Sequence, residues 1–352
     1  MNLFSNIKNN SQALIRCHRL RCYIYFLLVV ILFLVIDKVY IEWKWAHIFF
    51  SYEYGFLKRG LIGELLRLTK IPTSLDNFKI LSVLMLVGIT TAFFNIIKKE
   101  PTIVFIGFSL IFFCSPLLLK NLVYDWGRFD QIAIMVVLLQ LLWIGDARKS
   151  NYLLFCSPLL IFIHEATLLW AFPTILAIAF FENRKTLYLL IPLIALSTGV
   201  ILIWGGLDIA PNTYLTLLEE WAKPNNVHWA IIYTLTASLK DSILYSVPAL
   251  IINMHSERGY IAETVCVVSS IPLFFYKQRI WMILNFFALM SASTLFIIAN
   301  DHFRWISLLG IINLFFLLYA YKKNQIKNVN LMSVYLISIG MIVSFMSPVG
   351  IF

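Results

Sequence analysis

The sequence alternates long hydrophobic runs with short polar turns, and one run has an unusual length. Tyr152–Phe181 contains 30 mostly apolar residues, interrupted by the ionisable pair His164 and Glu165. One membrane-crossing helix needs about 20 such residues, so the run is too long for one crossing and short for two. Basic pairs at 148–149 and 184–185 flank it, and short loops rich in Lys and Arg stay in the cytoplasm. We therefore expect a hairpin that turns at His164 and Glu165.

The hairpin would place an ionisable pair inside the membrane. Its rising limb, Tyr152–Ile163, would span only about 18 Å as a helix, against a hydrocarbon core of about 30 Å. His164 and Glu165 would then form the floor of a cavity that opens to the outer face and lies below the outer membrane surface.

The same pattern predicts an all-α fold, a single transmembrane domain over residues 1–352 with about eleven crossings. Basic residues before residue 22 place the amino terminus in the cytoplasm, every basic tight turn then falls on that side, and the carboxyl terminus lies outside. We expect outer loops at about 41–78, 120–130, 205–260 and 300–305. Besides the hairpin, the spans are expected near 22–40, 79–97, 102–119, 131–145, 187–204, 261–276, 280–300, 306–321 and 331–349.

Composition supports the membrane class and narrows the partners. With 61% hydrophobic residues, 13% charged residues and a mean hydropathy of +0.84, a soluble domain is excluded. The net charge of +10 falls mainly in short loops between spans, so it indicates orientation in a membrane and not nucleic-acid binding. The five cysteines show no CxxC spacing, so we expect no disulfide framework, no metal and no cofactor.

Once the sidedness is set, mixed clusters of acids, bases and aromatics fall at the outer ends of spans. An ionisable group near lipid is costly unless it faces a cavity or a partner, so each cluster is a functional candidate. The clusters are Lys58 and Arg59; Asp125, Arg128 and Asp130; His164 and Glu165; and Asp301, His302 and Arg304.

Lys58 and Arg59 precede a short amphipathic segment, 61–68, that we expect to lie in the membrane interface. The two side chains could simply extend toward lipid headgroups. Alternatively, they could bind a lipid-linked phosphate together with the amino terminus of that helix.

The two Asp/Arg clusters also have two interpretations. Asp125 or Asp130 could form a structural ion pair with Arg128 that holds the loop. Alternatively, Arg128 could bind phosphate oxygens with both arms of its guanidinium, and Arg304 beside Asp301 repeats those ingredients.

His164 could be a buried imidazole bonded to Glu165 or to a backbone carbonyl. Alternatively, it could be a general base that Glu165 tunes, because His is the usual group that removes a hydroxyl proton near neutral pH. A zinc-protease HExxH motif is absent, because residue 168 is Leu.

The outer region 205–260 leaves two questions open. Residues 229–253 could be an additional hairpin split at Lys240 and Asp241, or helices lying on the outer surface. Its aromatic residues could form an interfacial belt or stack on sugars; they are Tyr214, Trp221, Trp229 and Tyr233.

The plan of nearly the whole chain resembles that of O-antigen and capsular repeat-unit polymerases of the Wzy type and of EpsG-like exopolysaccharide polymerases. The resemblance rests on ten or more spans, a basic outer set, a late outer arginine at Arg304, and FIHEATLL at 162–169, which is similar to an FxH turn of those families. EpsG-like proteins usually carry a small residue where this chain has Glu165.

The resemblance implies a metal-independent polymerase in the bacterial inner membrane. It would transfer an undecaprenyl-diphosphate-linked glycan to another lipid-linked repeat unit at the outer face, with a chain-length regulator protein as a further partner. Arg128, Arg304, Lys58 and Arg59 would bind the leaving diphosphate. His164, Glu165, Asp125 or Asp301 would remove the proton of the acceptor hydroxyl.

Two other functions fit parts of the sequence. A GT-C type glycosyltransferase would use a polyprenyl-phosphate sugar and a catalytic acid in the first outer loop, where Glu53 and Glu64 occur. A flippase or transporter of lipid-linked glycans would carry ionisable residues near mid-membrane and functional loops on both sides. This sequence collects them on one side.

Overall fold

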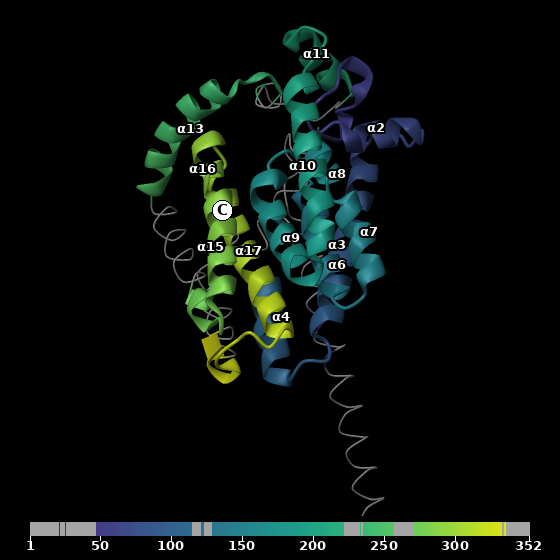
Figure 1. The fold of residues 1–352 in the computed structure, drawn as a ribbon. Coiled ribbons are helices and arrows are strands. Elements are labelled where there is room, and N and C mark those ends of the chain that lie inside the picture. Colours follow the sequence, from purple (N-terminus) through teal and green to yellow (C-terminus); the bar gives the residue numbers. More distant parts are fainter. Residues whose placement is uncertain are drawn as a thin grey trace, which may run out of the picture.

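The computed structural model describes residues 21, 25, 47–114, 121–122, 129–221, 233, 235–256, 271–332 and 334–335. Within these residues the fold is all-helical, apart from one isolated antiparallel bridge between Tyr276 and Ile326. Most helices run along the long direction of the molecule in Figure 1, with α2 (Leu61–Leu68) and α11 (Pro211–Trp221) at the upper end.

The remaining elements follow the predicted runs with shifted boundaries. In chain order they are η2 Tyr52–Tyr54, α3 Leu75–Ile97, α4 Thr102–Cys114, α6 Asp130–Leu142, α7 Ala147–Cys156, α8 Leu159–Ile163, α9 Thr167–Glu182, α10 Arg184–Trp204, α13 Leu239–Met254, η4 Ile271–Phe275, α15 Arg279–Ser293, α16 Leu295–Ile298 and α17 His302–Lys322.

Four of the described helical segments are long and apolar enough to cross a membrane. They are Asp76–Ile97, Arg184–Trp204, Arg279–Ile298 and His302–Lys322, and shorter apolar helices occur in α4, α6 and α9. This confirms the all-helical class and indicates a membrane protein. The expected spans near 22–40, 261–276 and 331–349 lie wholly or largely outside the described residues.

Helix α17 is the central helix of the bundle. In its most apolar stretch 94% of the residues are buried, against 17% in α10, and α17 packs on α6, α9, α15 and α16. A central helix can carry polar side chains if each finds a partner. Asn285 Nδ2 of α15 donates to Asn313 Oδ1 of α17 at 3.0 Å. In α10, by contrast, Leu202 and Ile203 are exposed, as expected for a helix that faces lipid.

The predicted hairpin is formed by α7, α8 and α9. Its turn falls at His164, as expected, and His164 itself ends α8 in an extended conformation. The rising limb is longer than expected, because α7 begins at Ala147 and not at Tyr152. From Ala147 to Ile163 it would cover about 25 Å as a continuous helix. Pro158, which lacks a backbone N–H, separates α7 from α8.

The break that one of the two alternatives placed at Lys240 and Asp241 falls slightly earlier, because helical residues end at Thr236 and α13 begins at Leu239. The helix begins one residue after Ser238, whose hydroxyl accepts from the Asp241 amide, while the Asp241 carboxylate accepts from the Ser238 amide. This capping box fixes the start of the helix at that point. Helix α13 packs on α16 at the left of Figure 1.

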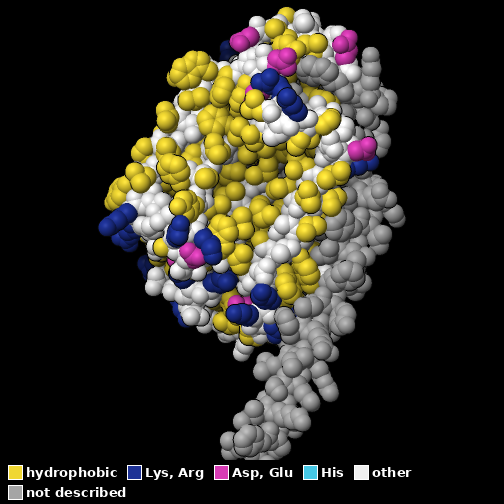
Figure 2. All heavy atoms as spheres, turned by 90° about the vertical axis from the view of Figure 1, so that its right-hand side faces the viewer, with side chains coloured by type: hydrophobic (Ala, Val, Ile, Leu, Met, Phe, Trp, Pro, Cys, Tyr) yellow, Lys and Arg dark blue, Asp and Glu magenta, His cyan; other side chains and the backbone are white. Residues whose placement is uncertain are grey.

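The basic turns between helices lie together at one end of the bundle. The turns after α3 and α6, the residues before α15 and the end of α17 line one common cavity there. The α9–α10 turn joins them, because Lys323 Nζ and Tyr319 Oη both bind Glu182 Oε1 at 2.6 Å. Figure 2 shows a face with a broad band of hydrophobic side chains and Lys and Arg side chains gathered along its lower edge.

At the opposite end, the loop before α2 is held tightly by backbone contacts. Gly206 N donates to Phe56 O at 3.1 Å and Asp208 N donates to Tyr54 O at 2.9 Å. Gly63 in α2 packs directly on the chain at 48–50, since a Cβ there would lie 2.1 Å from Phe50 O.

We predict that Gly63→Ala destabilises the protein by about 1–3 kcal/mol, because a backbone carbonyl cannot move aside as a flexible side chain can. Gly199→Ala in α10 is the matched control, since nothing lies within 4 Å of its Cβ position. That change should be neutral or stabilise by up to about 1 kcal/mol. Chemical unfolding in detergent micelles measures both, and equal effects would contradict the tight contact.

Candidate functional site

Ends of α6, α8 and α17 meet around a buried ionisable cluster, which we call the Arg304 cluster: Asp130, His164 and Arg304. Asp130 opens α6, His164 ends α8 and Arg304 lies in the first turn of α17. All three residues are at most 1% exposed. Residues from three separate chain regions therefore form one cluster at the end opposite the basic turns.

The cluster is organised by an ion pair. Arg304 Nε donates to Asp130 Oδ2 at 2.7 Å, and Arg304 Nη2 also contacts that oxygen. Asp301 Oδ2 lies 3.9 Å from Arg304 Nη1. The guanidinium plane also lies over the Trp305 ring, with Cζ 4.6 Å from its centroid. A buried guanidinium with a carboxylate partner is stable where an isolated one would not be.

His164 is oriented from both sides of its ring. The Ala166 amide donates to Nδ1 at 3.1 Å, and Arg304 Nη2 lies 3.0 Å from Nε2. A neutral imidazole has one acceptor nitrogen, which one of these two donors can use. The hydroxyl of Thr167 donates to the His164 carbonyl at 2.7 Å and fixes the turn itself. A neutral ring fits this geometry, and its single lone pair is engaged by one of the two donors.

The first turn of α6 is held in place by an unusual backbone conformation and by polar contacts. Phe129 precedes Asp130 with a φ of 60°, a left-handed conformation that a bulky residue rarely adopts. Gln131 Nε2 donates to Asn121 O at 2.5 Å, and Asn121 Nδ2 donates to Ser307 Oγ of α17 at 2.6 Å. These bonds tie the start of α6 to α17 one turn after Arg304.

A second ion pair borders the Arg304 cluster. Both Glu165 oxygens accept from Arg59, with Nη2 to Oε1 at 2.5 Å and Nε to Oε2 at 2.9 Å. Arg59 Nη1 lies 3.4 Å from His47 Nε2. The Glu165 side chain is 32% exposed and that of Arg59 is 13% exposed. This pair therefore forms the more accessible edge of the site. His164, the residue before Glu165, is buried.

A bond between His164 and Glu165 is one of the interpretations of His164, and the described contacts give the two side chains other partners. The two neighbours point to different partners, Arg304 and Arg59, because successive side chains diverge along the turn. A carboxylate that accepts from both arms of a guanidinium has little capacity left to accept a proton. Glu165 therefore serves to hold Arg59.

The backbone around Lys58 and Arg59 has an unusual conformation. Arg59 has a φ of 65°, and Gly60 follows it as the cap of α2. Backbone outliers of this kind concentrate at functional sites. Lys58 is half-buried and has no hydrogen bond or ion pair in the described part of the chain. Lys58, which has no such bond, is thus next in sequence to Arg59, which is bonded to Glu165.

Helix α2 contains a third pair, which fixes the loop before it. Arg67 Nε donates to Glu64 Oε2 at 2.9 Å, and the Tyr52 amide donates to the same oxygen at 3.1 Å. The hydrogen bond from Arg67 lowers the pKa of Glu64 below its ordinary value. Burial, and the charge of Glu64, raise the pKa of Tyr52 to about 12. A GT-C enzyme would need a catalytic acid in this loop. Glu64 is already held by Arg67 and the Tyr52 amide, whereas Glu53 is exposed.

Other predicted residues lie elsewhere. Asp125 and Arg128 fall outside the described residues. His302 points away from the cluster, with Nδ1 3.0 Å from Asn253 Nδ2 of α13. Tyr214 is fully buried against Phe50, so it neither belongs to an interfacial belt nor stacks on a sugar.

Sequence reasoning missed the pairing of Asp130 with Arg304, which lie 174 positions apart. It weighed Asp130 only as a partner of Arg128 in the same loop. A usable signal was present. Asp130 is the first residue of one helix and Arg304 lies in the first turn of another. If both helices enter the membrane from the same side, the two residues lie at the same depth. The contact of His47 with Arg59 had no such signal in the sequence.

We predict that Arg304→Met and Asp130→Leu each destabilise the fold by about 3–5 kcal/mol, because each leaves a buried charge without its partner. The double variant should cost less than the sum of the two single variants. Lys149→Met is the control, since its exposed ion pair with Asp146 contributes at most about 1 kcal/mol. Unfolding free energies in micelles test this, and strict additivity would count against the buried pair.

The Glu64 pair predicts a pH dependence. Because the folded pKa of Glu64 is lowered, its contribution is present above the ordinary Glu pKa of about 4.3 and is lost as pH falls through the lower folded value. Thermal melts from pH 6 down to about 3 should therefore fall less steeply for Glu64→Gln than for the wild type. Arg67→Ala should flatten the profile in the same way, and unchanged slopes in both variants would refute the assignment.

Among the described residues, no group of three or more His, Cys, Asp or Glu side chains is placed to hold a metal ion. No family model, no curated protein and no solved structure matches the chain. The geometry of the Arg304 cluster and of the Arg59–Glu165 pair is therefore the basis on which a function is assigned.

Proposed function

We propose that the protein is a membrane glycosyltransferase, a polysaccharide polymerase that joins lipid-linked repeat units at the outer face of the bacterial inner membrane. In this proposal the chain crosses the membrane about eleven times, with its amino terminus in the cytoplasm and its carboxyl terminus in the periplasm. The end that carries the Arg304 cluster would face the periplasm, and the end with the basic turns would face the cytoplasm.

One observation carries the proposal: a histidine that can accept a proton and a basic pair that can bind phosphate are adjacent at the same end of the bundle. Arg59 is bonded to Glu165, the residue next to His164. Glycosyl transfer from a lipid diphosphate needs these two functions near each other, one for the acceptor and one for the leaving group.

The leaving group would bind at the accessible edge of the site. When the bond between the anomeric carbon and the phosphate oxygen breaks, the diphosphate keeps the electron pair and gains negative charge. Lys58 and Arg59 would stabilise that charge, with phosphate oxygens replacing the carboxylate of Glu165 on Arg59. Arg128 remains a further candidate for this role.

The acceptor would be activated by His164. Its hydroxyl oxygen forms the new bond to the anomeric carbon, and its proton passes to the imidazole lone pair, which the Ala166 amide or Arg304 must first release. Arg304 is held by Asp130 and buried, so we assign it to positioning His164 and not to binding diphosphate. Asp301, at 3.9 Å from Arg304, would support that arrangement.

A GT-C type glycosyltransferase is the second candidate, and Glu53 is the observation that favours it. Glu53 lies exposed in η2, close in sequence to Lys58 and Arg59. In that case Glu53 would remove the proton and a polyprenyl-phosphate sugar would be the donor. Glu53→Gln would then abolish activity, and each repeat would lack one sugar.

We predict that His164→Ala lowers polymerisation by at least about 100-fold, the usual contribution of a general base. Cells that depend on the variant should accumulate single-repeat lipid-linked glycan and lose the ladder of longer chains, as scored by gel electrophoresis. His255→Ala is the matched control, because His255 is exposed at the end of α13.

Expression and membrane insertion of both variants must equal those of the wild type. A normal ladder in His164→Ala would rule out the proposed base. A full set of single repeats that accumulates on the cytoplasmic side would instead indicate a flippase.

A further inference from the structure

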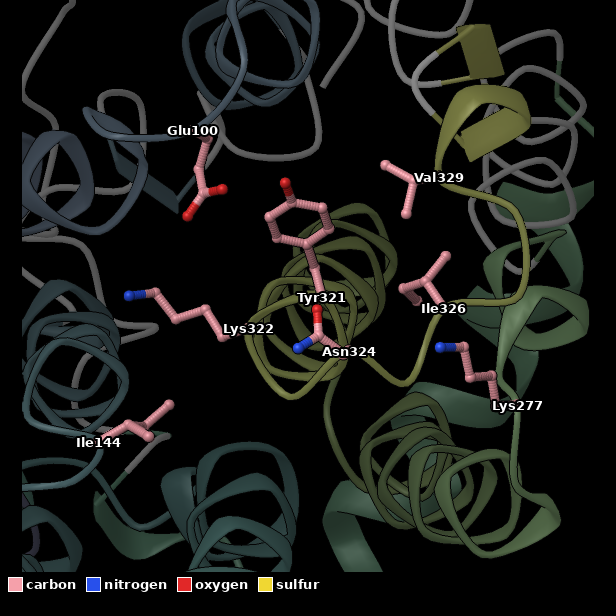
Figure 3. Close-up of a pocket in the computed structure, with 8 residues that line it drawn as sticks. All are labelled: Glu100, Ile144, Lys277, Tyr321, Lys322, Asn324, Ile326 and Val329. Atoms are coloured by element: carbon pink, nitrogen blue, oxygen red, sulfur yellow. The ribbon is translucent and has the colours of Figure 1, made fainter.

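A second polar site lies at the basic end of the bundle, opposite the Arg304 cluster (Figure 3). It is a cavity of about 450 Å³ whose polar lining is provided by Glu100, Lys277, Tyr321, Lys322 and Asn324. These residues come from the turn after α3, the segment before α15 and the end of α17. The cavity thus opens where several helices end, which is the depth of a membrane surface in a helical membrane protein.

The two lysines of this cavity differ in their surroundings. Lys322 interacts electrostatically with Glu100, whereas Lys277 lies on the other side of the cavity. Neither ammonium group has a hydrogen bond or a close ion pair in the part of the chain that the structure describes. The neighbouring Lys323, by contrast, binds Glu182 Oε1 at 2.6 Å.

The end of α17 does not need these lysines as caps. Asn324 adopts a left-handed conformation with a φ of 55°, and Gln325 N donates to Ala320 O at 2.8 Å. Lys323 N donates to Tyr319 O at 3.0 Å. Because backbone amides satisfy these carbonyls, the ammonium groups stay available for a ligand.

Figure 3 shows how the charges are arranged. Lys322 and Lys277 lie on either side of Tyr321 and Asn324, and the Glu100 carboxylate lies on the side of Lys322. Two cations and one acid leave a net positive charge, which suits a ligand with a single phosphate more than a polyanion. Ile144 and Ile326 add apolar lining, which suits the glycerol and upper acyl carbons of a lipid.

We propose that this cavity binds the phosphate of a phospholipid headgroup through Lys277 and Lys322, with Asn324 as a further hydrogen-bond donor. Basic pockets between membrane helices are established sites for acidic headgroups. Binding here would anchor the ends of α3, α15 and α17 to one membrane surface. The site is far from the Arg304 cluster, and its occupancy does not depend on the reaction proposed there.

Native mass spectrometry of the full chain in detergent, titrated with phosphatidylglycerol, tests the proposal. Lys277→Gln and Lys322→Gln should each weaken the tightest binding event about 5-fold, and the double variant about 25-fold. Glu100→Gln should strengthen it, because it removes the only acid among the named lining residues. The matched control is Lys185→Gln with Lys240→Gln, two exposed lysines outside the cavity.

Three outcomes would overturn the proposal. One is unchanged binding in the double cavity variant, with the fold verified by circular dichroism. Another is equal weakening in the control pair, which would show that the general surface charge acts. The third is displacement of the lipid by inorganic phosphate at millimolar concentration, which would assign the cavity to a free phosphate and not to a lipid headgroup.

Discussion

The buried pair of Arg304 and Asp130 is the interaction on which the architecture of one end of the bundle depends. Two opposite charges taken out of water are tolerated only if they meet each other with good geometry, and each is otherwise a large penalty. The first turns of α6 and α17 must therefore meet at one depth. Once they do, the guanidinium reaches Nε2 of His164 at 3.0 Å and the end of α8 is placed as well. One charge pair thus fixes three helix ends.

The turn between α8 and α9 brings the Arg304 cluster next to the pair of Arg59 and Glu165. Adjacent residues in a turn point in different directions, so His164 faces inward to Arg304 while Glu165 faces outward to Arg59. A buried group that can accept a proton and an accessible guanidinium thereby become neighbours without sharing a contact. In a continuous helix the Ala166 amide would donate to a backbone carbonyl, so it could not hold Nδ1 of His164 as it does here.

The two ends of the molecule use charge in opposite ways. At the end of the Arg304 cluster, acids and bases form pairs: Asp130 with Arg304, which is buried, Glu165 with Arg59, and Glu64 with Arg67. At the other end, lysines exceed acids and two of them face an open cavity. Paired charges hold a defined geometry, whereas unpaired lysines attract anionic surfaces. The two proposals, a reaction site at the end of the Arg304 cluster and a lipid site at the basic end, rest on this asymmetry.

The sequence by itself determined the helical class, the positions of most apolar helices, the turn at His164 and the common side of the basic turns. These follow from run length, hydropathy and the distribution of Lys and Arg, which are local properties. Only the tertiary structure decided which partner each ionisable side chain takes. Asp130 is three positions from Arg128 but binds Arg304, and Glu165 follows His164 but binds Arg59. Such choices depend on which helix ends meet in space and on the cost of leaving a buried charge alone, and neither is encoded in the spacing of residues along the chain.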